Sequence, residues 1–366
     1  MAAPILHVAP FLWSGAGRVI TDLCLAQRRR GPVVLVTTGR HQDLDDWPSY
    51  RRALARGGVR HVTLDTFHRD AATMWTSAAR LARLIDTLAP RVIHAHAGTP
   101  IGLSALARDI AGAGTRLVGQ MYSWGPDRPA WMNTQDLWAF RQADVVVSSA
   151  RAYSRLLEAG RVPRRRIVYL PWGLPLDALP MRAPQRLRSG PPILGFVGRL
   201  EPRKGQVDLV EAFARLRRAV PEARLELVGP AADAAYVQRL EDAIRRHRLG
   251  DAVRVMGRVP EIARVVRRWA LFVSLSADEG QGLAVLEAMA LGVPVLARRV
   301  AGIEDFLTDG RTGWAAPASG AAATARAMRR ALEADAAPVT ARARAMVERH
   351  YDWTAMLARV ERLYRA

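Results

Sequence analysis

Short runs of valine, isoleucine and leucine alternate along this chain with longer stretches that place apolar residues at helical spacing. Strands that read as continuous apolar runs are buried on both faces, which is typical of parallel sheets covered by helices. The pattern therefore predicts an α/β fold. In the first half of the chain, the expected strands are Ile5–Val8, Val33–Thr37, Val59–Leu64, Val92–His96, Arg116–Val118, Val145–Val147 and Ile167–Tyr169.

A proline-rich segment, Leu174–Pro192, interrupts this alternation and reads as an interdomain linker. A second series of strands is expected after it, at Ile193–Val197, Leu225–Val228, Val253–Met256, Leu271–Val273 and Val295–Leu296. We therefore expect two Rossmann-like domains, at 1–180 and 193–345, joined by a linker at 181–192. The Ala/Arg-rich stretch Ala321–Ala345 reads as a surface helix followed by a loop. The end of the chain, from about Val339 to Ala366, reads as amphipathic and helical, with 346–366 as a helix that packs back toward the first domain.

The length of 366 residues is sufficient for two domains with full hydrophobic cores, which excludes a disordered or fibrous protein. No apolar run approaches the roughly 20 residues that cross a bilayer. Cys24 is the only cysteine, so an intrachain disulfide and a cysteine-based zinc cluster are excluded. We expect a cytoplasmic protein, with a peripheral position on the inner face of the membrane left open.

The net charge of +20 is compatible with a nucleic acid, an anionic membrane or a phosphate-bearing substrate as partner. The basic residues are scattered through nearly every expected helix, and this distribution disfavours nucleic acid. They are arginines with one exception, Lys204. Ammonium and guanidinium groups are not interchangeable at phosphate sites. The residues around this single lysine are therefore candidates for a phosphate-binding site.

Lys204 lies in a turn that follows a buried strand, in the segment Val197-Gly198-Arg199-Leu200-Glu201-Pro202-Arg203-Lys204-Gly205. Ligands of open α/β sheets bind beyond the carboxyl ends of the strands. Arg199 and Lys204 are therefore expected to project into a crevice, where a forked donor and a point charge together neutralise a diphosphate. Arg203, in contrast, is expected to be a solvated basic residue.

A second segment, Glu279-Gly280-Gln281-Gly282-Leu283, follows the strand Leu271–Val273 and opens a helix that contains Glu287. The glycines let a ligand approach the backbone, and the N–H groups of the first helical turn favour an anion. Either glutamate alone reads as a helix cap or a surface acid. Together, around a Gly-x-Gly sequence, they indicate a cleft in which one carboxylate meets a reacting sugar and the other accepts hydrogen bonds from ribose hydroxyls.

These two segments resemble glycosyltransferase family 4, a family of retaining enzymes with the GT-B fold, and the resemblance is strongest from Ile193 to Trp314. It implies two facing Rossmann-like domains. It also implies that Arg199 and Lys204 hold the donor pyrophosphate, that Glu287 holds the ribose, and that Glu279 meets the donor sugar. The remaining implied donor contacts are the backbone from Gln281 through Gly282 to Leu283, and a weaker match for the base at Arg258 and Val259.

Three departures from the family pattern lie in this chain. Gln281 replaces the aromatic residue of the Glu-Gly-aromatic-Gly sequence, which leaves the preferred donor sugar open. Pro171-Trp172-Gly173-Leu174-Pro175 stands in place of Pro-Asn-Gly-Val-Asp. A Thr-x-His sequence is replaced by Gln120-Met121-Tyr122. The last two departures are interpreted as variation on the acceptor side.

The first expected domain contains further candidates. Gly15 and Gly17, between a strand and a helix, resemble the glycine-rich loop of the family near the phosphate. Ile20 stands where a dinucleotide fingerprint requires a third glycine, which disfavours NAD. His94 and His96 lie two apart on one strand, yet no nearby third or fourth ligand supports a metal. The resemblance places His96 at the donor sugar or the acceptor.

Tyr122 and Trp124 follow a strand end and are candidates to stack on a sugar acceptor. The resulting hypothesis is transfer of a sugar from a nucleoside-diphosphate sugar to an acceptor hydroxyl, with Glu279, His96, Arg199 and Lys204 as catalytic residues. We expect no metal and no cofactor, a sugar or lipid-linked acceptor, and no nucleic-acid partner. Contact with an anionic membrane, a nucleic-acid-binding protein and a catalytically silent binding protein of the same fold remain as alternatives.

Overall fold

The computed structural model describes residues 2–39, 47–67, 70–125, 128–181 and 190–365. The chain divides into two compact units. Unit 1 comprises Met1–Trp172 and Met356–Ala366, and unit 2 comprises Gly173–Ala355. The first crossing between the units thus lies at residues 172 and 173, ahead of the linker expected at 181–192. Of that expected linker, residues 182–189 lie outside the described part of the chain.

Unit 1 contains a parallel sheet with the strand order β3-β2-β1-β4-β5-β6-β7 in the described part of the chain. Its strands are β1 (Ile5–Val8), β2 (Val33–Thr37), β3 (Arg60–Thr63), β4 (Val92–His96), β5 (Arg116–Met121), β6 (Val145–Ser148) and β7 (Ile167–Tyr169). Its helices are α1 (Ser14–Arg28), α2 (Trp47–Arg56), α3 (Ala71–Leu88), α4 (Gly98–Ile110), α5 (Ala130–Gln142), α6 (Arg151–Ala159) and most of α13 (Trp353–Arg365), with a short 3-10 helix at Arg164–Arg166.

Unit 2 contains a parallel sheet with the order β10-β9-β8-β11-β12-β13 among the described residues. The strands are β8 (Ile193–Val197), β9 (Arg224–Val228), β10 (Val253–Gly257), β11 (Leu271–Ser274), β12 (Val295–Arg298) and β13 (Trp314–Ala316). The helices are α7 (Gln206–Leu216), α8 (Ala234–Arg246), α9 (Ile262–Val266), α10 (Leu283–Ala290), α11 (Ala321–Glu333) and α12 (Ala337–His350), with 3-10 turns at Leu176–Ala178 and Pro202–Lys204.

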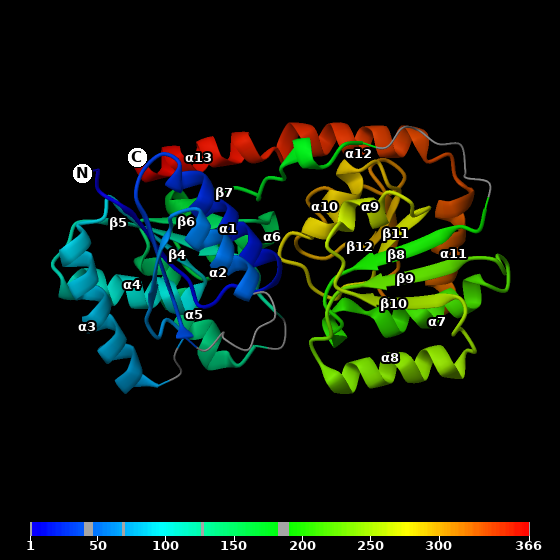
Figure 1. The fold of residues 1–366 in the computed structure, drawn as a ribbon, viewed down its shortest axis with the longest axis horizontal. Helices are drawn as coiled ribbons and strands as arrows, with labels where there is room; N and C mark the ends of the chain where they lie inside the picture. Colours follow the sequence, from blue (N-terminus) through cyan, green and yellow to red (C-terminus); the bar gives the residue numbers. More distant parts are fainter. Residues whose placement is uncertain (1, 40–46, 68–69, 126–127, 182–189, 366) are drawn as a thin grey trace. The chain divides into compact units, whose positions relative to one another are not determined.

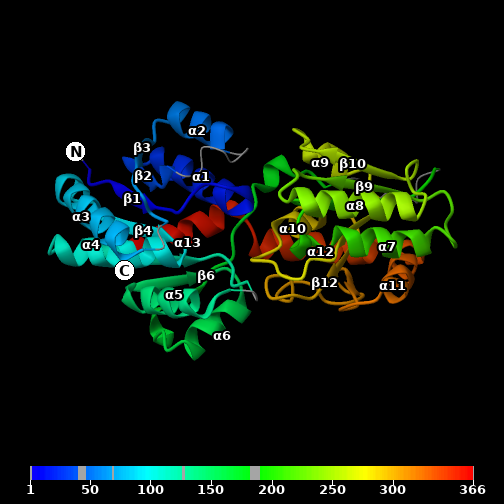
Figure 2. The same cartoon turned by 90° about the horizontal axis from the view of Figure 1, so that it is seen from below.

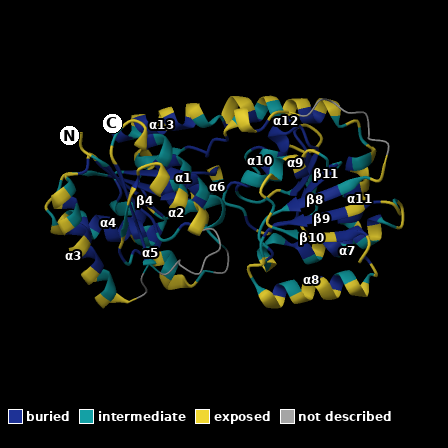
Figure 3. Ribbon diagram, in the orientation of Figure 1, coloured by how far each residue is buried: buried dark blue, intermediate teal, exposed yellow. Residues whose placement is uncertain are grey.

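Helices cover both faces of each sheet, as continuous apolar strands require. In unit 2, α7 and α8 lie on one face, and α9, α10 and α12 on the other (Figure 1 and Figure 2). The central strands are buried, while the helices expose one side to solvent (Figure 3). Trp269, which is fully buried, packs against Gly195 of β8 and donates its Nε1–H to Glu226 of β9 at 2.7 Å.

The C-terminal region differs from the expectation in one respect. The stretch expected to be helical from about Val339 to Ala366 forms two helices, of which the first, α12, begins at Ala337 and ends at His350. After Tyr351 and Asp352 the chain continues in α13, whose residues from Met356 onward belong to unit 1. Tyr364 of α13 is buried there against His94 of β4. Among the described residues, no helix combines the length and the apolar character that crossing a bilayer requires.

Candidate functional site

The turn after β8 is shaped by a glycine. Gly205 adopts a left-handed conformation with φ of 69°, and a Cβ atom there would lie 2.5 Å from the carbonyl oxygen of Leu275. No residue with a side chain fits this contact without moving the backbone. The contact holds the 3-10 turn Pro202–Lys204 against the segment that follows β11, because β8 and β11 are adjacent in the sheet.

The single lysine meets a glutamate from this second segment. Lys204 Nζ lies 2.6 Å from Glu279 Oε1, and the two side chains are 14% and 18% exposed. The Ser276 hydroxyl donates a hydrogen bond to the same carboxylate oxygen at 2.8 Å. Two groups that are 75 residues apart in sequence therefore form a partly buried ion pair at the carboxyl edge of the sheet.

Two arginines and two further acids lie beside this pair. Arg199 Nη2 contacts Glu201 at 3.0 Å, and Arg203 contacts both Glu201 and Asp278 at 3.2 Å. Arg203, which the sequence suggested to be a solvated basic residue, is 40% exposed and also pairs with these two acids. Of these four residues, Glu201 and Asp278 were missed by the sequence reasoning, although both lie within the segments that it singled out. Together with Lys204 and Glu279, the group holds as many carboxylates as cations, so its formal charge is balanced.

Helix α10 (Leu283–Ala290) begins directly after the Gly-x-Gly segment at the same edge of the sheet. Gly282 is the residue before the helix and has φ of 73°, and a Cβ atom there would lie 2.9 Å from Cγ1 of Ile303. Among the residues that the structure describes, no side chain caps the helix, and its first turn contains no acid. Gln281 is buried, and Glu287 lies half-buried further along α10. The first turn therefore presents backbone N–H groups that suit an anion.

The candidates for base recognition lie at the end of β10. Arg258 is exposed, and Val259 packs against the hydrophobic core of unit 2. β9 separates β10 from β8 in the sheet. The structure thus places Arg258 at the same edge as Arg199, two strands away.

The glycine-rich segment of unit 1 is helical, in contrast to the loop that the sequence suggested. Helix α1 begins at Ser14, so Gly15 and Gly17 belong to its first turns. A Cβ atom on Gly17 would lie 2.7 Å from the carbonyl carbon of Leu12. Gly17 is therefore required for close packing of α1 on the preceding segment.

Three buried histidines form a cluster in the sheet of unit 1. His7 of β1 lies in register with His94 of β4, and His96 lies two residues further on the same face. His7 Nδ1 and His96 Nε2 are 3.0 Å apart. His7 is the third imidazole that the sequence reasoning did not find, because a strand 87 residues earlier in the chain supplies it.

The charge state of the histidine cluster follows from its burial. Burial lowers the pKa of His7 to about 4. The pKa of His94 and that of His96 also lie well below the ordinary value, because burial and the neighbouring imidazoles disfavour a positive charge. All three rings are therefore neutral at pH 7. His96 has no exposed surface, and both of its ring nitrogens are in hydrogen bonds, to His7 and Tyr122. The direct contact with a substrate that was expected of His96 does not fit this geometry.

Tyr122 links the cluster to a hollow of about 220 Å³, which Trp124 also lines. The Tyr122 ring stacks on Trp172 with centroids 5.6 Å apart. Arg128 lies over the Trp124 ring at 4.3 Å and forms an ion pair with Asp136. Burial raises the pKa of the Asp136 carboxyl, and the Arg128 contact opposes this rise. The hollow thus offers aromatic faces and paired charges, which suit a polar ring.

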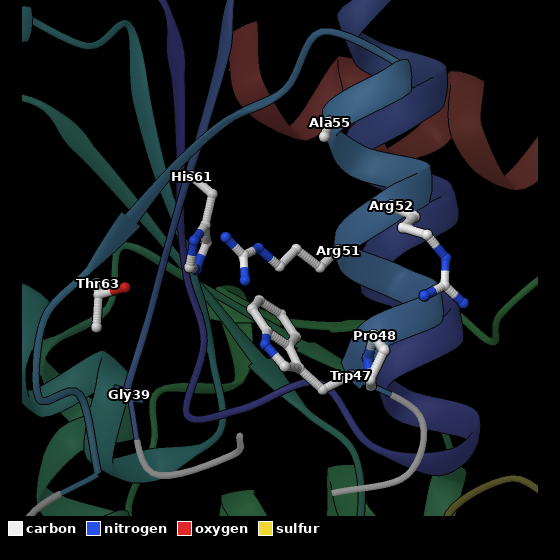
Figure 4. Close-up of a pocket in the computed structure, with 8 residues that line it drawn as sticks. All are labelled: Gly39, Trp47, Pro48, Arg51, Arg52, Ala55, His61 and Thr63. Atoms are coloured by element: carbon white, nitrogen blue, oxygen red, sulfur yellow. The ribbon is translucent and has the colours of Figure 1, made fainter. Parts of the chain in front are cut away.

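A larger hollow of about 600 Å³ lies between α2 and β3 (Figure 4). Its lining includes Trp47, Arg51 and His61, and the Arg51 side chain points toward the histidine (Figure 4). Burial and the nearby charge of Arg51 both lower the pKa of His61. A guanidinium beside an indole suits an anionic ligand.

Two family models match the chain. The model described as Glycosyltransferase Family 4 matches residues 13–178, and the model described as Glycosyl transferases group 1 matches residues 179–353. Together they span both units.

Curated relatives match over part of their length. The glycogen synthase of Mycobacterium tuberculosis is 31% identical over 235 residues, which are 63% of this chain and 56% of the relative. The D-inositol 3-phosphate glycosyltransferase of Nocardia farcinica is 34% identical over 183 residues, which are 46% of this chain and 40% of the relative. The chain thus spans about half the length of these two relatives.

Solved structures share the fold over the whole length. Anabaena HepE in complex with UDP and glucose superposes with a TM-score of 0.85 at 18% identity, covering 99% of both chains. Sucrose-phosphate synthase from Thermosynechococcus elongatus has a TM-score of 0.82 at 22% identity, covering 100% of this chain and 98% of that one. Because the two family models together match residues 13–353 and the solved structures share the fold over 99–100% of the chain, the chain belongs to the family 4, group 1 glycosyltransferases and has the GT-B fold.

Proposed function

We propose that the chain transfers a sugar from a nucleoside-diphosphate sugar to an acceptor hydroxyl, with retention of the anomeric configuration. The observation that carries this proposal is the group formed by Lys204, Glu279 and Arg199 at the carboxyl ends of β8 and β11. The fold that the chain shares with HepE, which was solved with UDP and with UDP-glucose, supports a nucleotide-sugar donor.

In the proposed reaction, the bond between the anomeric carbon and the diphosphate oxygen breaks, and a bond to the acceptor oxygen forms. The proton of the acceptor hydroxyl goes to the leaving diphosphate. Negative charge grows on the diphosphate in the transition state, where Lys204 and Arg199 stabilise it. Because side chains supply this positive charge, the proposed transfer uses no metal ion. The backbone N–H groups that begin α10 add to the stabilisation.

The ion pair between Lys204 and Glu279 sets the order of events at this site. A diphosphate that binds to the ammonium competes with the glutamate, since both anions are attracted to the same positive charge. Once the diphosphate displaces it, the Glu279 carboxylate is available to the donor sugar. The Ser276 hydroxyl, which donates to the same carboxylate oxygen, remains a partner of Glu279 after the exchange.

Replacing Glu279 by glutamine separates these two roles. We expect Glu279→Gln to bind the nucleoside diphosphate at least as tightly as the wild type, because the competing charge is gone. Turnover is expected to fall by about 10-fold or more, since the interaction with the reacting sugar is lost. Isothermal titration calorimetry and steady-state kinetics measure the two quantities. Equal losses of binding and turnover would contradict the assignment.

Glu287 is proposed to accept hydrogen bonds from the ribose. Glu287→Ala is expected to weaken nucleotide binding by about 10-fold, which corresponds to about 1.4 kcal/mol for a hydrogen bond to a charged group. Nucleotides that lack the 2′ or the 3′ hydroxyl provide the matched control. If Glu287 holds the ribose, one of these analogues binds more weakly to the wild type but not to the variant. An equal loss for both proteins would place Glu287 elsewhere.

The acceptor is proposed to bind in unit 1, at the hollow lined by Tyr122 and Trp124. His96 then acts as a positioning residue, because its imidazole holds the Tyr122 hydroxyl at 2.8 Å. The aromatic faces suit a sugar ring, which stacks its apolar side on such residues.

A panel of nucleotide sugars tests the proposed function directly. A donor that binds only the folded chain raises its stability by about 2.7 kcal/mol at a concentration of 100 times Kd. We expect one among the uridine-, guanosine- and thymidine-diphosphate sugars to raise the melting temperature and then to be consumed in the presence of an acceptor. The absence of any stabilising nucleotide sugar would refute the proposal.

A further inference from the structure

The histidine cluster of unit 1 has a feature that hydrogen bonding alone leaves unexplained. One nitrogen atom from each of His7, His94 and His96 lies within 4.8 Å of the other two. The ring centroids of His94 and His96 are 4.4 Å apart, and those of His7 lie 5.3 Å from each. All three residues are at most 1% exposed. Adjacent strands thus deliver three imidazoles to a single buried point.

Each imidazole is held at one of its nitrogens by a neutral polar group. The pairs are His7 Nε2 with Gln27 Oε1 at 2.7 Å, His94 Nδ1 with the Tyr364 hydroxyl at 2.7 Å, and His96 Nδ1 with the Tyr122 hydroxyl at 2.8 Å. Histidines that bind a metal show this arrangement, in which the nitrogen away from the ion donates to an outer partner and thereby fixes the ring.

The nitrogens on the other side of the rings face one another. His7 Nδ1 lies 3.0 Å from His96 Nε2, and His94 Nε2 is buried with no hydrogen-bond partner among the described residues. A buried nitrogen without a partner is unfavourable, so a ligand for it is expected. With zinc–nitrogen bonds of about 2.0–2.1 Å, two nitrogens at tetrahedral positions are about 3.3 Å apart, so small side-chain shifts suffice.

We propose that His7, His94 and His96 bind one divalent transition-metal ion, of which Zn²⁺ fits the ligand set best. Neutral imidazole is the ligand that zinc and its neighbours in the first transition series prefer, and the cluster includes no carboxylate that would favour magnesium or calcium. Binding places the ring protons on the nitrogens that face Gln27, Tyr364 and Tyr122.

The ion would join parts of unit 1 that are distant in sequence. His7 and the other two ligands come from different strands, Gln27 comes from α1, and Tyr364 comes from α13. The Gln27 amide also donates to the Tyr364 hydroxyl at 3.0 Å, which closes the outer ring of hydrogen bonds. The ion is assigned a role in holding α13 to the sheet and none in sugar transfer, so this proposal does not rest on the proposed function.

The test uses the full chain without a polyhistidine tag, stripped of metal by a chelator and dialysed against Zn²⁺. We expect one ion per chain by elemental analysis, and a melting temperature that rises with Zn²⁺. With Co²⁺, visible absorption of four-coordinate intensity is expected. If the wild type does not retain one ion per chain, the proposal is wrong. The 3.0 Å contact between His7 and His96 is then an ordinary hydrogen bond between the two rings.

Variants locate the ion. His94→Gln keeps the contact between His7 and His96 but is expected to abolish the metal-dependent rise in melting temperature. Tyr364→Phe, which removes an outer partner and keeps all three ligands, is expected to weaken binding by about 10 to 100-fold. His61→Gln, another strand histidine of unit 1, is the matched control and should bind as the wild type does. Unchanged binding in both His94→Gln and Tyr364→Phe would show that the ion lies elsewhere.

Discussion

Replacing Lys204 by alanine is expected to lower kcat/KM by about 100 to 1000-fold, the loss found when one preorganised donor to a transition-state charge is removed. Two effects act together. The leaving diphosphate loses the ammonium, and the Glu279 carboxylate, which lies 2.6 Å from that ammonium, is left to repel the donor. Steady-state kinetics with the donor identified by the panel measures the effect.

A double variant separates these two contributions. Lys204→Ala combined with Glu279→Gln removes the repulsion, so nucleotide binding is expected to recover in part while turnover stays low. Arg215→Ala provides the control, because Arg215 is a half-exposed arginine of α7 in a surface ion pair. Its kinetics should match those of the wild type. Similar losses of kcat/KM in Arg215→Ala and Lys204→Ala would mean that the overall positive charge of the chain, and not this site, supports the reaction.

The second large effect is expected at Trp269, a core residue that packs against the strand leading to the same site. Trp269→Ala is expected to lower the free energy of unfolding of unit 2 by about 3–5 kcal/mol, since the indole is fully buried. The ring fills the space above Gly195 of β8, and its Nε1–H satisfies Glu226. Loss of the ring therefore loosens the strand that leads to Arg199. Calorimetric unfolding with and without nucleotide measures the change.

Two further tryptophan variants serve as comparisons for Trp269→Ala. Trp269→Phe keeps most of the volume but loses part of the ring and the hydrogen bond to Glu226, so an intermediate loss is expected. Trp75→Ala, at a residue of α3 that is 53% exposed, should change the stability by less than about 0.5 kcal/mol. A small effect of Trp269→Ala, or an equal effect at Trp75, would contradict the account of the core.

Much of the fold could be predicted from the sequence because its strands are buried on both faces. Their apolar runs stand out, and β1, β4 and β8 begin and end at the expected residues. The three-residue strand β13 at Trp314–Ala316 was missed because, unlike the equally short β7, it consists mainly of alanine, which does not favour a strand. The break between α12 and α13 at Tyr351 and Asp352 was not predicted, because no proline or glycine marks it.

One part of the candidate site could be predicted from a general rule of parallel sheets. Residues at the carboxyl ends of adjacent parallel strands come together, and this rule predicted the approach of Lys204 and Glu279. The charge balance was not predicted, because the spacing of Glu201 and Asp278 does not reveal that both contact Arg203. His7 was missed for a related reason. The pairing of β1 with β4 is a property of the sheet, and no local pattern encodes it.

The central claim is that the donor diphosphate binds to Lys204 and Arg199 in unit 2. The crystal structure of the chain in complex with the nucleoside diphosphate of its donor tests this claim most directly. We predict phosphate oxygens at about 2.7–2.9 Å from Lys204 Nζ and from the Arg199 guanidinium, with Glu279 displaced from the ammonium. A diphosphate bound elsewhere, for example beside Arg51 in the hollow of unit 1, with the pair of Lys204 and Glu279 intact, would contradict it.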